Sequence, residues 1–163
     1  MTPGLARAPR IARAVGAVSL LVVGGVHFQQ YTADYFSAIP IIGPLFLVNF
    51  ISATAVGLVL LVPMGSAVRF WRLTLDTAAA LAGTGIAVGA FAALLISEHT
   101  PLFGFMEHGY RLAILIALGA EVVAAATLAA FVSSALRRLC ALRGGGSRGE
   151  TERASGRVRT DAR

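Results

Sequence analysis

Residues 110–136 read YRLAILIALGAEVVAAATLAAFVSSAL and are the clearest indication of the architecture of this chain. After Arg111, the only charged residue in this stretch is Glu121. A helix needs about 20 mostly apolar residues to cross a bilayer core about 30 Å thick. A spanning segment must also satisfy its backbone hydrogen bonds within itself. This stretch therefore predicts a transmembrane helix.

Three earlier stretches have the same character, and they are residues 11–28, 44–63 and 75–97. The first contains Arg13, whose long side chain can reach the headgroups. No convincing cleavage site follows Phe28, so we interpret this stretch as an uncleaved signal anchor. The sequence predicts an all-α fold, a four-helix transmembrane bundle with short loops over residues 11–136, preceded by an N-terminal segment, 1–10.

The composition supports a membrane protein. Of the 163 residues, 56% are apolar and only 13% are charged, whereas soluble proteins average about 25% charged residues. This deficit argues against a soluble globular enzyme. The single cysteine, Cys140, excludes a disulfide-exchange membrane enzyme, because that chemistry needs cysteine pairs.

The arginines predict the orientation. All 14 basic residues are arginine, and with four spans only Arg111 falls on the opposite side from the rest. The positive-inside rule then places both termini in the cytoplasm, and we expect a multi-pass protein of a bacterial plasma membrane. Because the basic residues flank the membrane and no groove-reading motif accompanies them, nucleic acid is not expected as a partner.

The tail, residues 137–163, differs in character from the rest. It contains eight arginines, three acidic residues and the run Gly144–Gly146. Such a segment cannot bury enough apolar surface to fold, so it predicts a disordered cytoplasmic tail. Its positive charge could hold it against anionic lipid.

Two polar residues within the spans are candidates for binding a ligand or a proton. Glu121 lies about 16 Å from the outer end of its span at 1.5 Å per residue, which is close to the midplane. A carboxyl group without a nearby cation favours its neutral form there. Glu121 could therefore hold helices together as a hydrogen-bond donor, or it could bind and release a proton or a cationic substrate. Asn49 is the second candidate, with interhelical hydrogen bonding as the alternative.

A second polar group is expected at the outer face. Its members are His27, Glu98, His99, Glu107, His108 and Arg111. Glu107 and Arg111 have the spacing of a local ion pair. His27, His99 and His108 could ligate a metal ion or a haem iron, but ordinary hydrogen bonding is the preferred explanation and no cofactor is predicted.

The loop 29–43 has a pattern typical of an interfacial segment. Aromatic residues alternate with polar ones, and Pro40 and the Gly43–Pro44 pair then interrupt the chain before the second span. The pattern predicts a short helix that either lies in the headgroups or covers a cavity between the spanning helices.

Three segments carry a family resemblance, and they are HFQQY at 27–31, IPIIGPLFLVN at 39–49 and LFGFMEHGYR at 102–111. With these segments the chain resembles small, uncharacterised four-helix membrane proteins of actinobacteria. The resemblance implies that the outer loop, Asn49, Glu107 and Arg111 belong to the pattern of that group. It implies no catalytic residue.

Three functions are compatible with these features. The first is a non-enzymatic accessory protein that binds lipid, another membrane protein or a second copy of itself. The second is a small proton- or cation-coupled transporter that uses Glu121. The third is a metal- or haem-binding redox protein that uses His27, His99 and His108.

Overall fold

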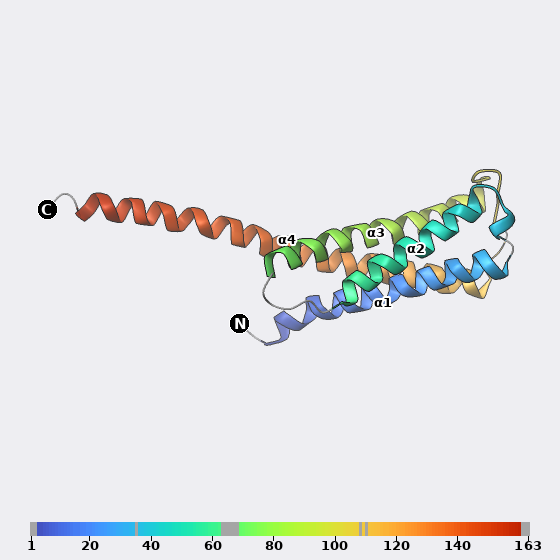
Figure 1. Ribbon diagram of the computed structural model, residues 1–163, viewed down its shortest axis with the longest axis horizontal. Coiled ribbons are helices and arrows are strands. Elements are labelled where there is room, and N and C mark those ends of the chain that lie inside the picture. Colours follow the sequence, from blue (N-terminus) through green and yellow to red (C-terminus); the bar gives the residue numbers. More distant parts are fainter. Residues whose placement is uncertain (1–2, 35, 63–68, 108, 110, 161–163) are drawn as a thin grey trace.

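The computed structural model describes residues 3–34, 36–62, 69–107, 109 and 111–160, with the backbone alone at 3–6, 69–70 and 142–160. This part of the chain contains α1 (Pro3–Ala33), the short 3₁₀ helix η1 (Phe36–Ala38), α2 (Ile42–Leu61), α3 (Arg69–His99) and α4 (Leu112–Thr160). Figure 1 shows the helices side by side, with both chain ends at one end of the bundle. We call this the termini end, and the opposite end, with η1 and residues 100–111, the loop end.

The four predicted spans are confirmed as helices long and apolar enough to cross a membrane. The spanning segments are Arg7–Ala33, Ile42–Leu61, Trp71–His99 and Leu112–Ala141. Large apolar side chains such as Val48, Leu81 and Val122 are about half exposed on the outer surface of the bundle. Lipid chains solvate such a surface well, so the fold is that of an integral membrane protein.

Helices α1 and α3 begin earlier than the charge-free stretches predict, and an ion-pair cluster joins the two helices near these ends. Arg13 Nη1 lies 2.9 Å from Asp76 Oδ2, and Arg72 Nε lies 2.8 Å from Asp76 Oδ1. Arg72 also donates from Nη2 to the carbonyl oxygen of Val62. Asp76 lies inside α3 and joins α1 to α3, while Arg72 connects the cluster to the end of α2.

Small residues allow the helices to approach closely. A Cβ atom on Gly57 of α2 would lie 3.0 Å from the carbonyl oxygen of Ala17 in α1. A Cβ on Gly16 would lie 2.5 Å from Leu128 Cδ2 in α4. At Gly85 and Gly89, by contrast, no atom of another described helix lies within 4 Å of a Cβ.

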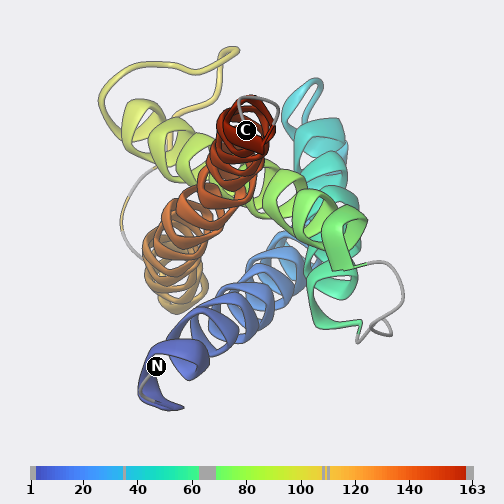
Figure 2. The ribbon, with the colours of Figure 1, turned by 90° about the vertical axis from the view of Figure 1, so that its left-hand side faces the viewer.

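The buried core fills the bundle toward the termini end. Its largest members are Leu20, Leu60, Leu128 and Phe131, and small alanines such as Ala124 lie between them. Figure 2 views the ribbon from the termini end, with α4 extending toward the viewer. A cavity lies beyond this core, nearer the loop end.

The predicted disorder of the tail from residue 137 is not supported by the described part of the chain. Helix α4 continues without interruption to Thr160, and Figure 1 shows it extending beyond the bundle. A helix already formed in the membrane adds residues at little cost, and the eight arginines of the tail are good helix formers.

Candidate functional site

A cavity of about 140 Å³ lies among the four helices toward the loop end. Each helix contributes to its wall, and η1 and residues 102–107 contribute from the loops. The wall residues of α4 are Ile114, Ala117 and Glu121. Because three or four residues separate them, they lie on one face of the helix. The cavity is therefore built by all parts of the fold that meet at this end.

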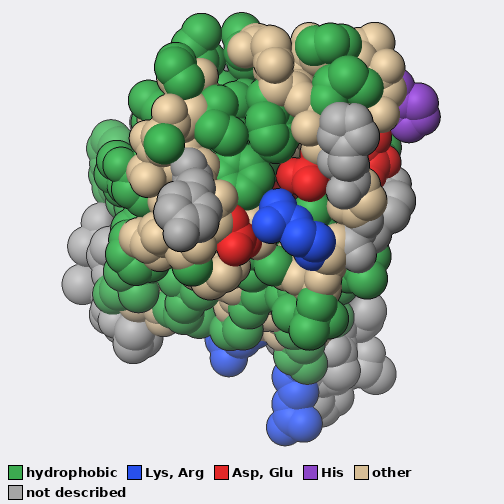
Figure 3. Space-filling model, turned by 90° about the vertical axis from the view of Figure 1, so that its right-hand side faces the viewer, with side chains coloured by type: hydrophobic (Ala, Val, Ile, Leu, Met, Phe, Trp, Pro, Cys, Tyr) green, Lys and Arg blue, Asp and Glu red, His purple; other side chains and the backbone are tan. Residues whose placement is uncertain are grey.

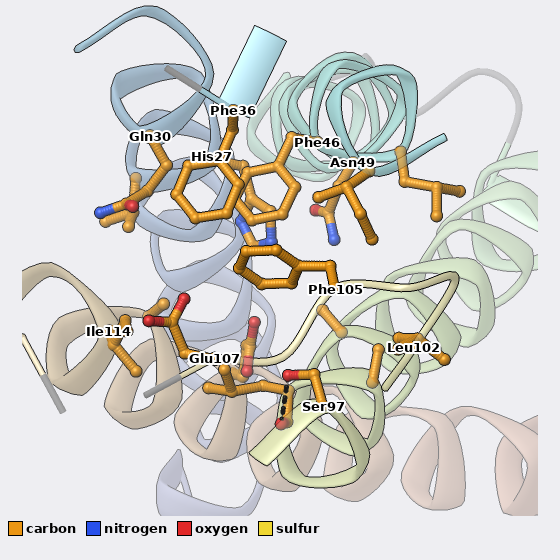
Figure 4. Close-up of a pocket in the computed structure, with 18 residues that line it drawn as sticks. His27, Gln30, Phe36, Phe46, Asn49, Ser97, Leu102, Phe105, Glu107 and Ile114 are labelled. Carbon is orange, nitrogen blue, oxygen red and sulfur yellow. Dashed lines mark hydrogen bonds between the residues drawn. The ribbon is translucent and has the colours of Figure 1, made fainter. Parts of the chain in front are cut away.

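Aromatic rings form much of the wall. The ring of Phe36 stacks on that of Phe46 with centroids 4.7 Å apart, and Phe105 meets Phe36 edge-on at 5.4 Å. His27 packs against the other side of the group, 5.1 Å from Phe46. Figure 4 shows these rings together beside the cavity. The loop 29–43 was predicted either to cover a cavity or to lie in the headgroups, and through Phe36 it lines one.

The inner end of the cavity contains the two residues predicted to bind a ligand or a proton. Glu121 is only 2% exposed, and it lies about 14 Å along α4 from Leu112 at 1.5 Å per residue. Its Oε2 atom and the Oδ1 atom of Asn49 are buried, and neither has a hydrogen-bond partner among the described residues. Buried polar atoms are rarely left without partners, so each needs an explanation.

The hydroxyl groups at a similar depth do not provide these partners. Ser52 Oγ donates to the carbonyl oxygen of Val48 at 2.7 Å, and Thr84 Oγ1 donates to that of Ala80 at 2.8 Å. Both bonds stay within one helix. The interhelical hydrogen bond considered for Glu121 is therefore not formed with either of these residues.

Arg111 is the centre of a polar cluster at the mouth of the cavity. Its Nη1 lies 3.3 Å from Asp34 Oδ2, and its Nη2 lies 3.5 Å from Glu107 Oε2. Nη2 also donates to Gln30 Oε1 at 3.3 Å. The Glu107–Arg111 ion pair predicted from the sequence is confirmed. Figure 3 shows this end of the bundle, with a basic side chain between acidic ones and apolar surface around them.

A turn brings Glu107 to this position. The backbones of Leu102 and Phe105 exchange hydrogen bonds of 2.8 and 3.0 Å, and Gly104 has a φ of 80° that favours glycine. The Glu107 amide then donates to the Ser97 carbonyl oxygen at 3.1 Å, which folds the loop back onto the end of α3. This fold places Phe105 and Glu107 over the cavity.

The predicted outer-face group is only partly brought together. His27 lines the cavity, and its Nδ1 lies 2.9 Å from the carbonyl oxygen of Val23. His99 is exposed and makes the same contact with Leu95. Glu98 is half-buried and does not line the cavity, and His108 lies outside the described residues.

The metal or haem hypothesis stays a prediction. Within residues 3–34, 36–62, 69–107, 109 and 111–160, no three His, Cys, Asp or Glu side chains are grouped so that they could hold a metal ion. His27 lines the cavity and packs against Phe46, whereas His99 is exposed at the end of α3.

The sequence did not indicate Gln30 or Asp34 as members of the site. Gln30 is 4% exposed and lies one turn after His27, which places both on the cavity side of α1. This i, i+3 spacing was a usable signal. Their contacts with Arg111 join residues about 80 positions apart in the chain, and no local pattern predicts such contacts.

No protein family model, curated protein or solved structure matches this chain. The resemblance to four-helix proteins of actinobacteria therefore stays a prediction.

Proposed function

We propose that this integral membrane protein binds a small, mostly apolar molecule in the cavity near the loop end. The observation that carries the proposal is the cavity itself, whose walls are mostly carbon and whose inner end has two buried oxygen atoms without partners. Ligand sites are typically apolar clefts with a few convergent polar groups. A ligand that donates hydrogen bonds to Glu121 and Asn49 would satisfy both oxygens.

The size of the cavity limits the ligand. An apolar cavity of about 150 Å³ engineered in another protein accepts one benzene molecule, and the cavity here measures about 140 Å³. The part of the ligand that the cavity encloses is thus about the size of one ring with a short polar group. The headgroup and two chains of a whole phospholipid do not fit in this space.

Binding is the activity that the wall residues support, rather than catalysis. Ser97 Oγ donates to the carbonyl oxygen of Leu94 at 2.8 Å, and His27 Nδ1 contacts that of Val23. Each of these two side chains contacts a backbone carbonyl oxygen of its own helix. A nucleophile and its general base would instead be hydrogen-bonded to each other.

The arginine pattern supports an orientation with both termini in the cytoplasm of a bacterial cell. The cavity would then lie in the outer half of the plasma membrane, beneath Arg111. The basic extension of α4 would reach into the cytoplasm, where its arginines could contact anionic lipid. A homo-oligomer or a second membrane protein as partner stays a prediction.

The binding proposal can be tested with a neutral one-ring probe, 4-fluorobenzyl alcohol, followed by fluorine NMR in phosphatidylcholine nanodiscs. We expect saturable broadening of the probe signal with the unmodified protein. Ala117→Phe and Ala93→Leu each fill the cavity from a different helix and should abolish that broadening. Ala129→Phe is the matched control, because Ala129 is exposed on the same helix as Ala117. Equal broadening in the filled variants would show that the probe binds lipid or another surface, and the proposal would fail.

A small proton- or cation-coupled transporter is the second candidate. The buried, unpartnered Oε2 of Glu121 favours it, because such a group can exchange a proton for a cationic ligand. Transport would also need a second arrangement of the helices, since Leu20, Leu60 and Leu128 fill the bundle between Glu121 and the termini end. Uptake into proteoliposomes that is lost in Glu121→Gln would support transport, whereas binding without uptake would favour a binding protein.

A further inference from the structure

The charges around the cavity indicate which class of molecule it accepts. Two carboxyl groups, those of Glu121 and Glu107, are part of the wall, and none of the described wall residues is an arginine or a lysine. The unpartnered atoms at the inner end are oxygens, Glu121 Oε2 and Asn49 Oδ1. A cation bound beside Glu121 favours the ionised form of its carboxyl group. The ionised carboxylate only accepts hydrogen bonds, and so does the amide oxygen. The inner end therefore suits a group that donates hydrogen bonds and carries positive charge.

The positive charge of Arg111 at the mouth of the cavity does not repel a cationic ligand, because carboxylates neutralise it. Arg111 contacts two carboxylates, Asp34 at 3.3 Å and Glu107 at 3.5 Å, so this cluster has one positive and two negative groups. Arg111 also precedes Glu121 by about 15 Å of helix at 1.5 Å per residue. A positive charge of the ligand beside Glu121 would thus lie far from the guanidinium group of Arg111.

The aromatic wall suits the same class of ligand. Ring faces attract cations through their quadrupole, and the Arg111 guanidinium already lies 5.7 Å from the centroid of Phe36. The rings of Phe46 and Phe105 pack directly against Phe36. These rings can receive either the apolar body of a ligand or the edge of its cationic group.

An inorganic cation fits this cavity poorly. Calcium takes six to eight oxygen ligands and magnesium prefers a complete octahedron. Here the two unpartnered oxygens face walls made mainly of carbon, such as those of Ile114, Ala117 and Leu94. A cation bound here must bring its own apolar body to fill the remaining space.

We infer that the ligand is a small organic ammonium ion with a body of about one ring. Its N–H groups donate to Glu121 and Asn49, and its apolar body packs against Phe36, Phe46 and Phe105. This inference rests on the proposed binding function and names the class of its ligand.

Three probes that share one fluorinated ring test the inference. They are 4-fluorobenzylamine, which is an ammonium ion at neutral pH, the neutral 4-fluorobenzyl alcohol and the anionic 4-fluorobenzoate. Their dissociation constants are measured by fluorine NMR in phosphatidylcholine nanodiscs, whose lipid carries no net charge. We expect the ammonium ion to bind about tenfold more tightly than the alcohol, because hydrogen bonds to charged groups are the stronger ones. We expect no binding of the benzoate.

The variant Glu121→Gln keeps the shape of the side chain and removes its charge. It should reduce the affinity for the ammonium ion to that for the alcohol and leave the alcohol within about twofold of its original affinity. Glu98→Gln is the matched control, because Glu98 does not line the cavity, and it should leave both affinities unchanged. The comparison of three probes on the unmodified protein does not require any variant to fold.

The possible results separate the two proposals. If the alcohol binds as tightly as the ammonium ion, or if the preference survives in Glu121→Gln, the inference about the ligand class is overturned and the binding function stands. If none of the three probes binds, the binding function itself fails.

Discussion

Replacing Glu121 by methionine should make the bundle more stable. Glu121 is 2% exposed and its Oε2 has no hydrogen-bond partner among the described residues. A buried polar group without a partner costs about 1–3 kcal/mol of folding free energy. Methionine has a similar length and an unbranched, adaptable chain, so the surrounding packing should change little. We therefore expect the free energy of unfolding to rise by about 1 kcal/mol or more.

The assay is equilibrium unfolding of the protein in bicelles by a denaturing detergent, followed by circular dichroism. Val122→Met is the control, because Val122 is the next residue and is about half exposed to lipid. Its free energy of unfolding should change by less than about 0.5 kcal/mol. If Glu121 instead holds helices together by a hydrogen bond, Glu121→Met will lower the stability by about 0.6–2 kcal/mol. That result would refute the idea that this carboxyl group is kept for a ligand.

Three further predictions concern other parts of the fold. Asp76→Asn should lower the free energy of unfolding by about 2 kcal/mol in the same assay, because it weakens the pairing with Arg13 in a largely buried cluster; an unchanged value would contradict the structural role of that pair. Gly57→Leu should destabilise the bundle by about 2 kcal/mol or more, because even a Cβ there would lie 3.0 Å from the backbone of α1, whereas Gly85→Leu should have little effect; equal effects would contradict the described packing. Cys140 is exposed and is the only cysteine, so a membrane-impermeant maleimide should label it only after intact cells are opened; labelling of intact cells would refute the proposed orientation.

The four spans could be predicted because the cost of placing charge in lipid acts on each residue separately. Long gaps between charged residues are therefore sufficient to locate the helices. The helix ends were predicted less well, since Asp76 neutralises arginines through a contact between α1 and α3 that is not local in sequence. The helical extension of α4 was missed because its composition is also that of a disordered segment.

Single residues of the candidate site could be predicted from the sequence, but their arrangement around one cavity could not. Glu121 and Asn49 stand out because polar residues in a span need an explanation. Their position at the inner end of one cavity depends on how four helices pack. The clustering of Gln30 and Asp34 with Arg111 depends on the same packing and on the turn before Glu107. Hydrophobic periodicity has no information about such contacts between distant segments.

The most direct test of the account is to locate a bound ligand within the bundle. Intermolecular nuclear Overhauser effects should be measured between 4-fluorobenzylamine and the protein in nanodiscs with deuterated lipid. If the probe binds in the cavity, its ring should show contacts to the rings of Phe46 and Phe105, which line the cavity. Contacts only to Trp71, which is 65% exposed near the opposite end of the bundle, would contradict binding in the cavity.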